Sequence, residues 1–379
     1  MTVATLVNQT VLGPLSNGVT RFYAPAFERG DLGGFLNAVR RLVISATWII
    51  VLMVLLTVAG LLIAGRTEWI AIVTAALIFS ILSGYNSTLS GIQNAARQRS
   101  IVAFHQGMES WARFLVAVAL MVWLGATSTV AMVGYAVAAT LVLGSQYVYF
   151  RKIVSAHITG ADKERNWQQK VWKYSWPFAS WGVFSWAQQA SDRWALGLFA
   201  TTQEVGLYVV LFQLGYYPIS MATSMAMQFL APIFYQRGGD ASDSRRNANV
   251  NSLSWRLTWS ALSVTGVAFL ASLLFHAQIF QVLVAKEYGA VSYLLPWVML
   301  AGGVFAAGQT IALSLMSQMK THTMMAAKIV TALLGVILNF SGAYWYGTTG
   351  IVIAGVLFSV SYLIWMTVLS LRTAAGRCT

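Results

Sequence analysis

Residues 42–64 read LVISATWIIVLMVLLTVAGLLIA, a run without a single charged side chain. A helix that crosses a membrane needs about 20 consecutive, mostly apolar residues, and this run is long enough. A membrane β-barrel would show instead segments of about 10 residues in which polar and apolar side chains alternate. The stretch therefore predicts a transmembrane α-helix and sets the fold class of the chain as all-α.

The composition extends that prediction to the whole chain. Only 9% of the 379 residues are charged and 58% are hydrophobic, whereas a soluble domain carries about 25% charged residues. So few charges cannot cover the surface of a soluble protein. The composition excludes a soluble enzyme and a disordered chain, and it predicts a polytopic helical membrane protein.

Eleven segments have the length and hydropathy of membrane helices. The first is the most polar, because it contains Asn17 and Arg21, and it would insert poorly by itself. In chain order the segments are 3–23, 42–64, 69–93, 101–124, 130–150, 171–199, 205–235, 257–275, 291–316, 325–345 and 351–371.

The basic residues are distributed unevenly between the two sides of these helices. Nineteen of the 24 Lys and Arg residues fall in one alternating set of connecting segments, with Lys173 and Lys328 counted at the adjoining helix ends, and only Arg66 and Lys286 fall in the other. Cytoplasmic loops carry the excess of basic residues, so the larger set and the C-terminus are predicted to be cytoplasmic. The net charge of +13 then reflects topology and contact with anionic membrane lipid, and no nucleic-acid partner is needed to explain it.

The organisation of the chain suggests two lobes. We predict an N-terminal helical bundle at 1–150, a cytoplasmic amphipathic linker at 151–173 and a C-terminal helical bundle at 174–379. The linker prediction rests on its many basic residues and on Trp167 and Trp172. Gly-Pro-Leu-Ser at 13–16 followed by Ala-Pro-Ala-Phe at 24–27 is echoed by Tyr-Pro-Ile-Ser at 217–220 and Ala-Pro-Ile-Phe at 231–234. This echo favours two parallel repeats.

Several short motifs point to one family. They are Thr-Arg-Phe-Tyr-Ala at 20–24, Glu-Arg-Gly-Asp at 28–31, Ser-Asp-Arg-Trp-Ala-Leu-Gly at 191–197, Gly-Leu-Tyr at 206–208, Lys-Glu-Tyr at 286–288, and Asn339 with Tyr-Gly-Thr-Thr-Gly at 346–350. In these motifs the sequence resembles the oligosaccharide (O-antigen, Wzx-type) flippases of the multidrug/oligosaccharidyl-lipid/polysaccharide exporter (MOP) superfamily. The resemblance implies a 12-helix plan, of which the first helix is missing here.

The same resemblance implies a function. It is the translocation of an undecaprenyl-diphosphate-linked oligosaccharide from the inner to the outer leaflet of the bacterial inner membrane by alternating access. Lipid-linked oligosaccharide, membrane lipid, a polysaccharide polymerase and a chain-length regulator are the implied partners, and no cofactor is implied. Polysaccharide and O-antigen biosynthesis is the implied process.

Candidate site residues are the ionisable groups within the predicted helices, because such groups are costly in lipid and usually face a wet interior. Arginine binds diphosphate well, since it stays charged and can form two parallel hydrogen bonds. The predicted substrate-cavity residues are Arg21, Asn17, Arg113, Gln189, Arg193 and Trp186. Asp192 and Glu109 are predicted either to couple transport to an ion or to form ion pairs.

Other interpretations stay open at this stage. Glu109 and Arg113, at i and i+4, are spaced for an ion pair within one helix. Arg21 and Lys328 can instead extend along their helices toward the membrane surface. A cation-coupled multidrug exporter of the same fold is the alternative function, followed by a truncated remnant that does not transport. No catalytic triad, phosphate-binding loop or metal-ligand spacing occurs in the sequence, so we expect no enzymatic activity and no metal.

Overall fold

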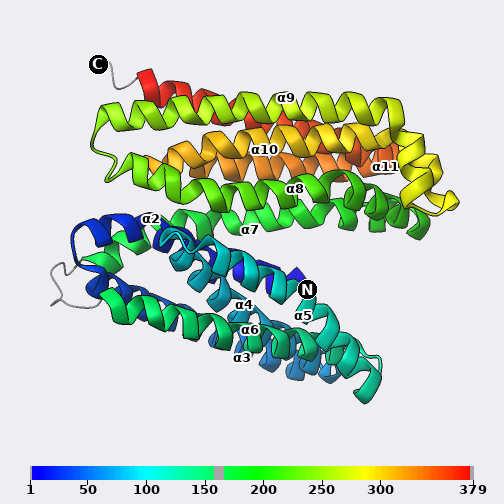
Figure 1. Ribbon diagram of the computed structural model, residues 1–379. Helices are drawn as coiled ribbons and strands as arrows, with labels where there is room; N and C mark the ends of the chain where they lie inside the picture. Colours follow the sequence, from blue (N-terminus) through cyan, green and yellow to red (C-terminus); the bar gives the residue numbers. More distant parts are fainter. Residues whose placement is uncertain (1, 158–165, 376–379) are drawn as a thin grey trace. The chain divides into compact units, whose positions relative to one another are not determined.

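The computed structural model describes residues 2–157 and 166–375, and all of the regular secondary structure in this part of the chain is helical (Figure 1). The prediction of an all-α fold is confirmed. The chain divides into two compact units, Met1–Val183 and Phe184–Thr379, and the boundary falls inside helix α7, Trp167–Phe199. Part of the predicted linker at 151–173, residues 158–165, lies outside the described residues.

The first unit contains the helices before α7 and the first half of α7 itself. Their bounds are α1 Thr2–Val7, η1 Asn8–Leu12, α2 Gly13–Glu28, α3 Leu32–Ile63, η2 Thr67–Trp69, α4 Ile70–Ala95, α5 Arg99–Leu124 and α6 Ser128–His157. Within this unit α4 packs against both α2 and α6, and α5 packs against α6.

Helices α1, η1 and α2 follow one another without a break. The middle segment η1 is a π-helix, in which the Gly13 N–H donates to the Asn8 carbonyl five residues earlier. Pro14 follows directly and has no N–H to donate. Single π-helical turns inside α-helices are frequent at functional sites.

Trp167 anchors the start of α7 in the first unit. Its side chain is 1% exposed, its Nε1–H donates to Asp31 Oδ2 at 2.8 Å, and its ring meets those of Phe22 and Phe35 edge-on. Of the two linker tryptophans, only Trp172 is exposed. Trp167 therefore lies in the interior of the first unit, where Asp31 gives its N–H a buried acceptor.

The second unit consists of the rest of α7 and four further helices. They are α8 Thr202–Gly238, α9 Ser244–Leu283, α10 Leu295–Ser317 and α11 Thr321–Ala375, with the short η3 Lys286–Leu294 before α10. Helix α10 packs against α8, α9 and α11 (Figure 1). Among the candidate membrane helices of this unit it has the largest buried share. Leu211 of α8 and Leu295 of α10 belong to one core cluster.

Helix α11 is a hairpin of two helical arms. The chain reverses at Gly347, whose φ of +54° favours glycine. A Cβ on Gly342 would lie 2.5 Å from the Gly350 carbonyl oxygen, so the arms touch where both residues lack a side chain. Small residues allow membrane helices to approach this closely.

Eight of the described helices are long and apolar enough to cross a membrane, by length and composition. One of them is α11, whose two arms correspond to the last two predicted segments. The predicted segment 3–23 is not among the eight, because it is divided among α1, η1 and α2, each too short to span a membrane. The segment 171–199 is not among them because α7 is long enough but less apolar. The chain is a multi-pass membrane protein.

Two helices are longer than the sequence predicts. Helix α3 begins at Leu32, ten residues before the predicted start at Leu42, and α9 runs from Ser244 to Leu283 rather than over 257–275. Hydropathy detects the part of a helix that matches the hydrocarbon layer. The backbone hydrogen bonds of α3 continue through Arg40 and Arg41, beyond the apolar stretch.

Candidate functional site

Asn17 and Arg21 are one turn apart on α2, and side chains at this spacing share a helix face. Arg21 is 1% exposed and Asn17 is half-buried. The helix continues for seven residues past Arg21, to Glu28. The alternative in which Arg21 extends to the membrane surface therefore does not describe this structure, since the side chain is enclosed within the first unit.

Glu109 and Arg113 of α5 form an ion pair through Glu109 Oε1 and Arg113 Nη2. Their side chains are 16% and 31% exposed. Ser83 and Asn86 of α4 lie within 3.5 Å of the pair, Ser83 as an acceptor from Arg113 and Asn86 as a donor to Glu109. The Arg113 guanidinium also stands 4.8 Å from the ring centroid of Phe79. Both charges are thus compensated where α4 meets α5.

One face of α7 in the second unit carries three of the predicted substrate residues. Trp186, Gln189 and Arg193 follow the i, i+3, i+7 spacing of a helix face. Trp186 is half-buried, whereas Gln189 and Arg193 are exposed. The Trp186 ring meets Trp194 edge-on, and the Arg193 guanidinium stands 5.4 Å from the ring centroid of Phe212 on α8.

A different face of α7 is buried and polar. Asp192 is 6% exposed and accepts hydrogen bonds from the Tyr208 hydroxyl of α8 at 2.8 Å and from the Arg193 backbone N–H at 2.7 Å. Ser191 Oγ accepts from Asn339 Nδ2 of α11, also at 2.8 Å. This face therefore connects α7 to both α8 and α11, and it holds the Asp192 carboxylate through hydrogen bonds.

Lys328 lies in the first arm of α11 and packs across the hairpin. Its Nζ is 4.6 Å from the ring centroid of Tyr362, a 2%-exposed residue of the second arm. The expectation that Lys328 extends along its helix to the membrane surface is wrong. Sequence reasoning set this residue apart from the site, although a lysine inside an apolar segment was a usable signal.

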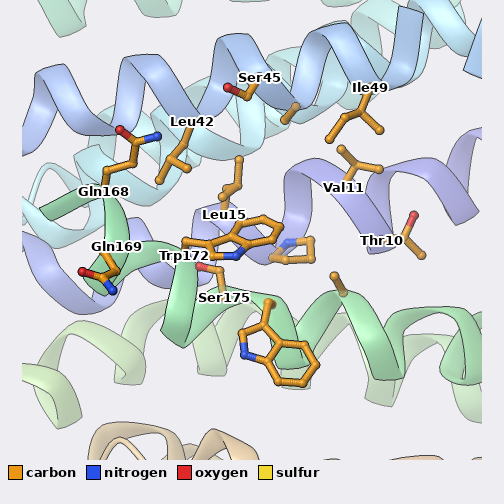
Figure 2. A pocket seen from close by; sticks show the side chains of 14 residues that line it. Thr10, Val11, Leu15, Leu42, Ser45, Ile49, Gln168, Gln169, Trp172 and Ser175 are labelled. Carbon is orange, nitrogen blue, oxygen red and sulfur yellow. The ribbon is translucent and has the colours of Figure 1, made fainter. Parts of the chain in front are cut away.

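A groove of about 680 Å³ lies in the first unit among η1–α2, α3 and α7 (Figure 2). Its lining includes Leu15, Leu42 and Ile49, together with Trp172 and Trp176. Sequence reasoning missed this groove, because its walls come from three segments that are far apart in the chain and apolar in ordinary ways.

The predicted site residues therefore fall in two groups. Asn17, Arg21, Glu109 and Arg113 belong to the first unit, and Trp186, Gln189, Asp192 and Arg193 belong to the second. In the first unit Glu109 forms an ion pair with Arg113. In the second unit Asp192 accepts a hydrogen bond from the backbone N–H of Arg193. Side chains that sequence reasoning left out of the site, above all Tyr208 and Asn339, are the ones that hold the α7 residues in position.

The fold matches that of known transporters. A mutant of the MATE transporter VcmN from Vibrio cholerae superposes with a TM-score of 0.76 and 14% identity, over 98% of this chain and 86% of that one. An outward-facing multidrug resistance MATE transporter of the MOP superfamily gives a TM-score of 0.72 at 10% identity, over 99% of this chain and 85% of that one. A MOP-superfamily transporter from Pyrococcus furiosus gives a TM-score of 0.70 at 10% identity, over 97% of this chain and 85% of that one. That protein is described as having a binding pocket of reverse polarity.

The sequence itself matches no family model and no curated protein. At 10–14% identity the structural likeness establishes the fold alone. The chain shares the fold of these MATE and MOP-superfamily transporters, as the sequence motifs predict.

Proposed function

We propose that the protein is a flippase that moves a lipid-linked oligosaccharide, joined through a diphosphate to undecaprenol, from the cytoplasmic to the outer leaflet of a bacterial inner membrane. The observation that carries the proposal is the charge balance inside the predicted spans. Three arginine side chains, those of Arg21, Arg113 and Arg193, stand against the two carboxylates of Glu109 and Asp192. Such an excess suits an anionic substrate.

Both carboxylates already have partners. Glu109 pairs with Arg113, and Asp192 accepts from Tyr208 and from the Arg193 backbone. Arg193 is exposed at its helix face and stays positively charged. A guanidinium offers a diphosphate two parallel, charge-assisted hydrogen bonds, which compensate the phosphate charge while the head group crosses the membrane.

The arrangement in the membrane forms part of the same proposal. Eleven spans are grouped as two parallel repeats, the basic loops and the C-terminus face the cytoplasm, and transport proceeds by alternating access. Trp186 and Gln189, on the same α7 face as Arg193, are suited to stack on a sugar ring and to hydrogen-bond its hydroxyls. A polysaccharide polymerase and a chain-length regulator would use the translocated product.

A cation-coupled drug exporter is the second candidate, favoured by the likeness to a multidrug resistance transporter. A cationic drug needs a carboxylate that is available to it. In this chain Glu109 is engaged by Arg113 and Asp192 by Tyr208. Drug export is for this reason a weaker candidate than flipping of a lipid-linked oligosaccharide, and a remnant without transport activity is the third candidate.

The test is an export assay in a bacterium whose own oligosaccharide flippase has been deleted. The intact chain should restore surface polysaccharide. Arg21→Ala and Arg193→Ala should each raise the lipid-linked intermediate roughly tenfold, because a charge-assisted hydrogen bond is worth about 1.5–3 kcal/mol. Arg21→Lys and Arg193→Lys should recover part of the export, since they keep the charge but lose the bidentate geometry.

Arg66→Ala is the matched control, because its side chain is 69% exposed and lies outside the predicted spans. It should export like the unsubstituted chain at equal membrane abundance. Full export by both alanine variants, or no export by the unsubstituted chain, would count against the flippase.

A further inference from the structure

The groove of the first unit has two chemically different ends. Gln168 and Gln169, at the start of α7, lie beside Leu42 at one end, and Thr10 and Ile49 lie toward the other (Figure 2). Helices α3 and α7 each enter the groove at the amide end, so an elongated molecule lying in it would meet side-chain amides at one end only.

The wall between these ends is mostly apolar, and Ser45 and Ser175 are its polar side chains. Leu15 and Leu42 present aliphatic side chains, and Trp172 and Trp176 add aromatic surface. The hydroxyl of Ser45 bonds the Arg41 carbonyl at 3.1 Å. The Thr10 hydroxyl bonds the Leu6 carbonyl at 2.8 Å. These two hydroxyls therefore already donate to backbone carbonyls one turn earlier in the chain. The groove suits an apolar chain.

Positive charge gathers at the amide end. Arg40 and Arg41 directly precede Leu42 on α3, and Lys173 directly follows Trp172 on α7, and all three are exposed. The first turn of the 33-residue helix α7 also lies at this end, with no acidic residue in it. A helix N-terminus favours a negative group through its unpaired N–H groups. Among the described residues, no carboxylate lines the groove.

We propose that this groove binds one acyl chain of an anionic phospholipid, with the phosphate held by Arg40, Arg41 and Lys173. Its volume lies within the range of about 300–1,000 Å³ that is typical of small-molecule sites. A zwitterionic lipid has a chain of the same chemistry but no net charge to match the three cations. The inference is independent of the transported substrate, because every residue in it lies in the first unit and outside the predicted substrate site.

The experiment uses the full chain in lipid nanodiscs and phospholipids with a photoreactive group near the end of one acyl chain. Phosphatidylglycerol and phosphatidylcholine probes are compared, and the labelled peptides are identified by mass spectrometry. Phosphatidylglycerol should label the walls around Ala46, Ile49 and Ala179 several times more strongly than other lipid-facing helices. Phosphatidylcholine should label them weakly.

Charge variants test whether the basic residues at the amide end hold the phosphate. Arg40→Gln, Arg41→Gln and Lys173→Gln together should lower phosphatidylglycerol labelling of the groove by roughly tenfold or more, since each cation near a membrane surface strengthens anionic-lipid binding severalfold. The matched control combines Arg245→Gln, Arg246→Gln and Arg256→Gln, three exposed cations of α9. It should leave the labelling of the groove unchanged.

A variant that fills the groove with a larger side chain provides the second measurement. Ala46→Trp, at a 5%-exposed lining residue, should abolish labelling by both probes. Equal labelling by phosphatidylglycerol and phosphatidylcholine in the unsubstituted chain would overturn the proposal, and so would labelling spread evenly over lipid-facing helices. Because the labelling of the unsubstituted chain decides the matter, poor folding of a variant does not remove the test.

Discussion

Asn339 donates a hydrogen bond from its Nδ2 to Ser191 Oγ at 2.8 Å, across 148 residues of chain. Both residues are buried, and the bond joins the first arm of α11 to α7. One residue along α7, Asp192 accepts from Tyr208 of α8. Three segments that are far apart in the sequence are therefore joined by two neighbouring hydrogen bonds in the second unit.

This contact predicts a measurable coupling between Asn339 and Ser191. Asn339→Ala and Ser191→Ala should each lower stability in detergent, and the double variant should lose less than the sum of the two. Hydrogen bonds between membrane helices average about 0.6 kcal/mol and reach about 1.7 kcal/mol in double-mutant cycles, so the coupling should fall in that range. Ser359→Ala is the control, because that hydroxyl bonds the Gly355 carbonyl of its own helix arm. Strict additivity of Asn339→Ala and Ser191→Ala would contradict the structure.

The ion pair on α5 predicts a rescue experiment. Glu109→Gln leaves the Arg113 charge partly enclosed without its partner, and Arg113→Gln does the same to Glu109. Each single change should lower the melting temperature, at a cost of about 1–3 kcal/mol. The double variant with both glutamines should recover most of the loss, because no uncompensated charge remains. A double variant less stable than either single one would show that the two residues act independently.

The α11 hairpin predicts a steric requirement at Gly342. Any Cβ there would lie 2.5 Å from the Gly350 carbonyl oxygen, so Gly342→Val must force the arms apart. We expect a loss of at least about 1–3 kcal/mol, as for other overpacked cores, read out as aggregation in size-exclusion chromatography. Gly266→Val on α9, where a Cβ meets nothing within 4 Å, should remain monodisperse. Equal behaviour of the two valine variants would refute the close approach of the arms.

Tyr362 predicts a contrast between two substitutions. Its hydroxyl is buried and has no hydrogen-bond partner among the described residues, while its ring lies beside the Lys328 ammonium. Tyr362→Phe should therefore be neutral or slightly stabilising, and Tyr362→Leu should cost about 0.5–2 kcal/mol through the lost cation–π contact. The midpoint of thermal unfolding measures both. A larger loss for phenylalanine than for leucine would mean that the hydroxyl matters more than the ring.

Hydropathy alone was enough to predict most of the fold. The apolar run at 42–64 and its counterparts identify helices that the structure contains, because the membrane imposes one length on every span. Helix ends were not predictable in this way. Helices α3 and α9 extend beyond their apolar segments, since backbone hydrogen bonding continues outside the hydrocarbon layer.

The candidate site was only partly accessible from sequence. Helical spacing correctly predicts that Glu109 can reach Arg113. Which α7 face is buried depends on Tyr208 and Asn339, which only tertiary packing brings close. The same holds for Trp167, whose partner Asp31 precedes it by 136 residues.

The most direct test of the proposed function is lipid translocation by the purified chain in liposomes. Undecaprenyl-diphosphate-linked oligosaccharide is incorporated into both leaflets, and an external glycosidase reports which sugars become accessible. The flippase account predicts that the protein exposes the inner-leaflet pool and that Arg193→Ala slows this exposure. A protected inner-leaflet pool, in vesicles where the same protein accelerates efflux of a cationic dye, would contradict the account and favour the drug exporter.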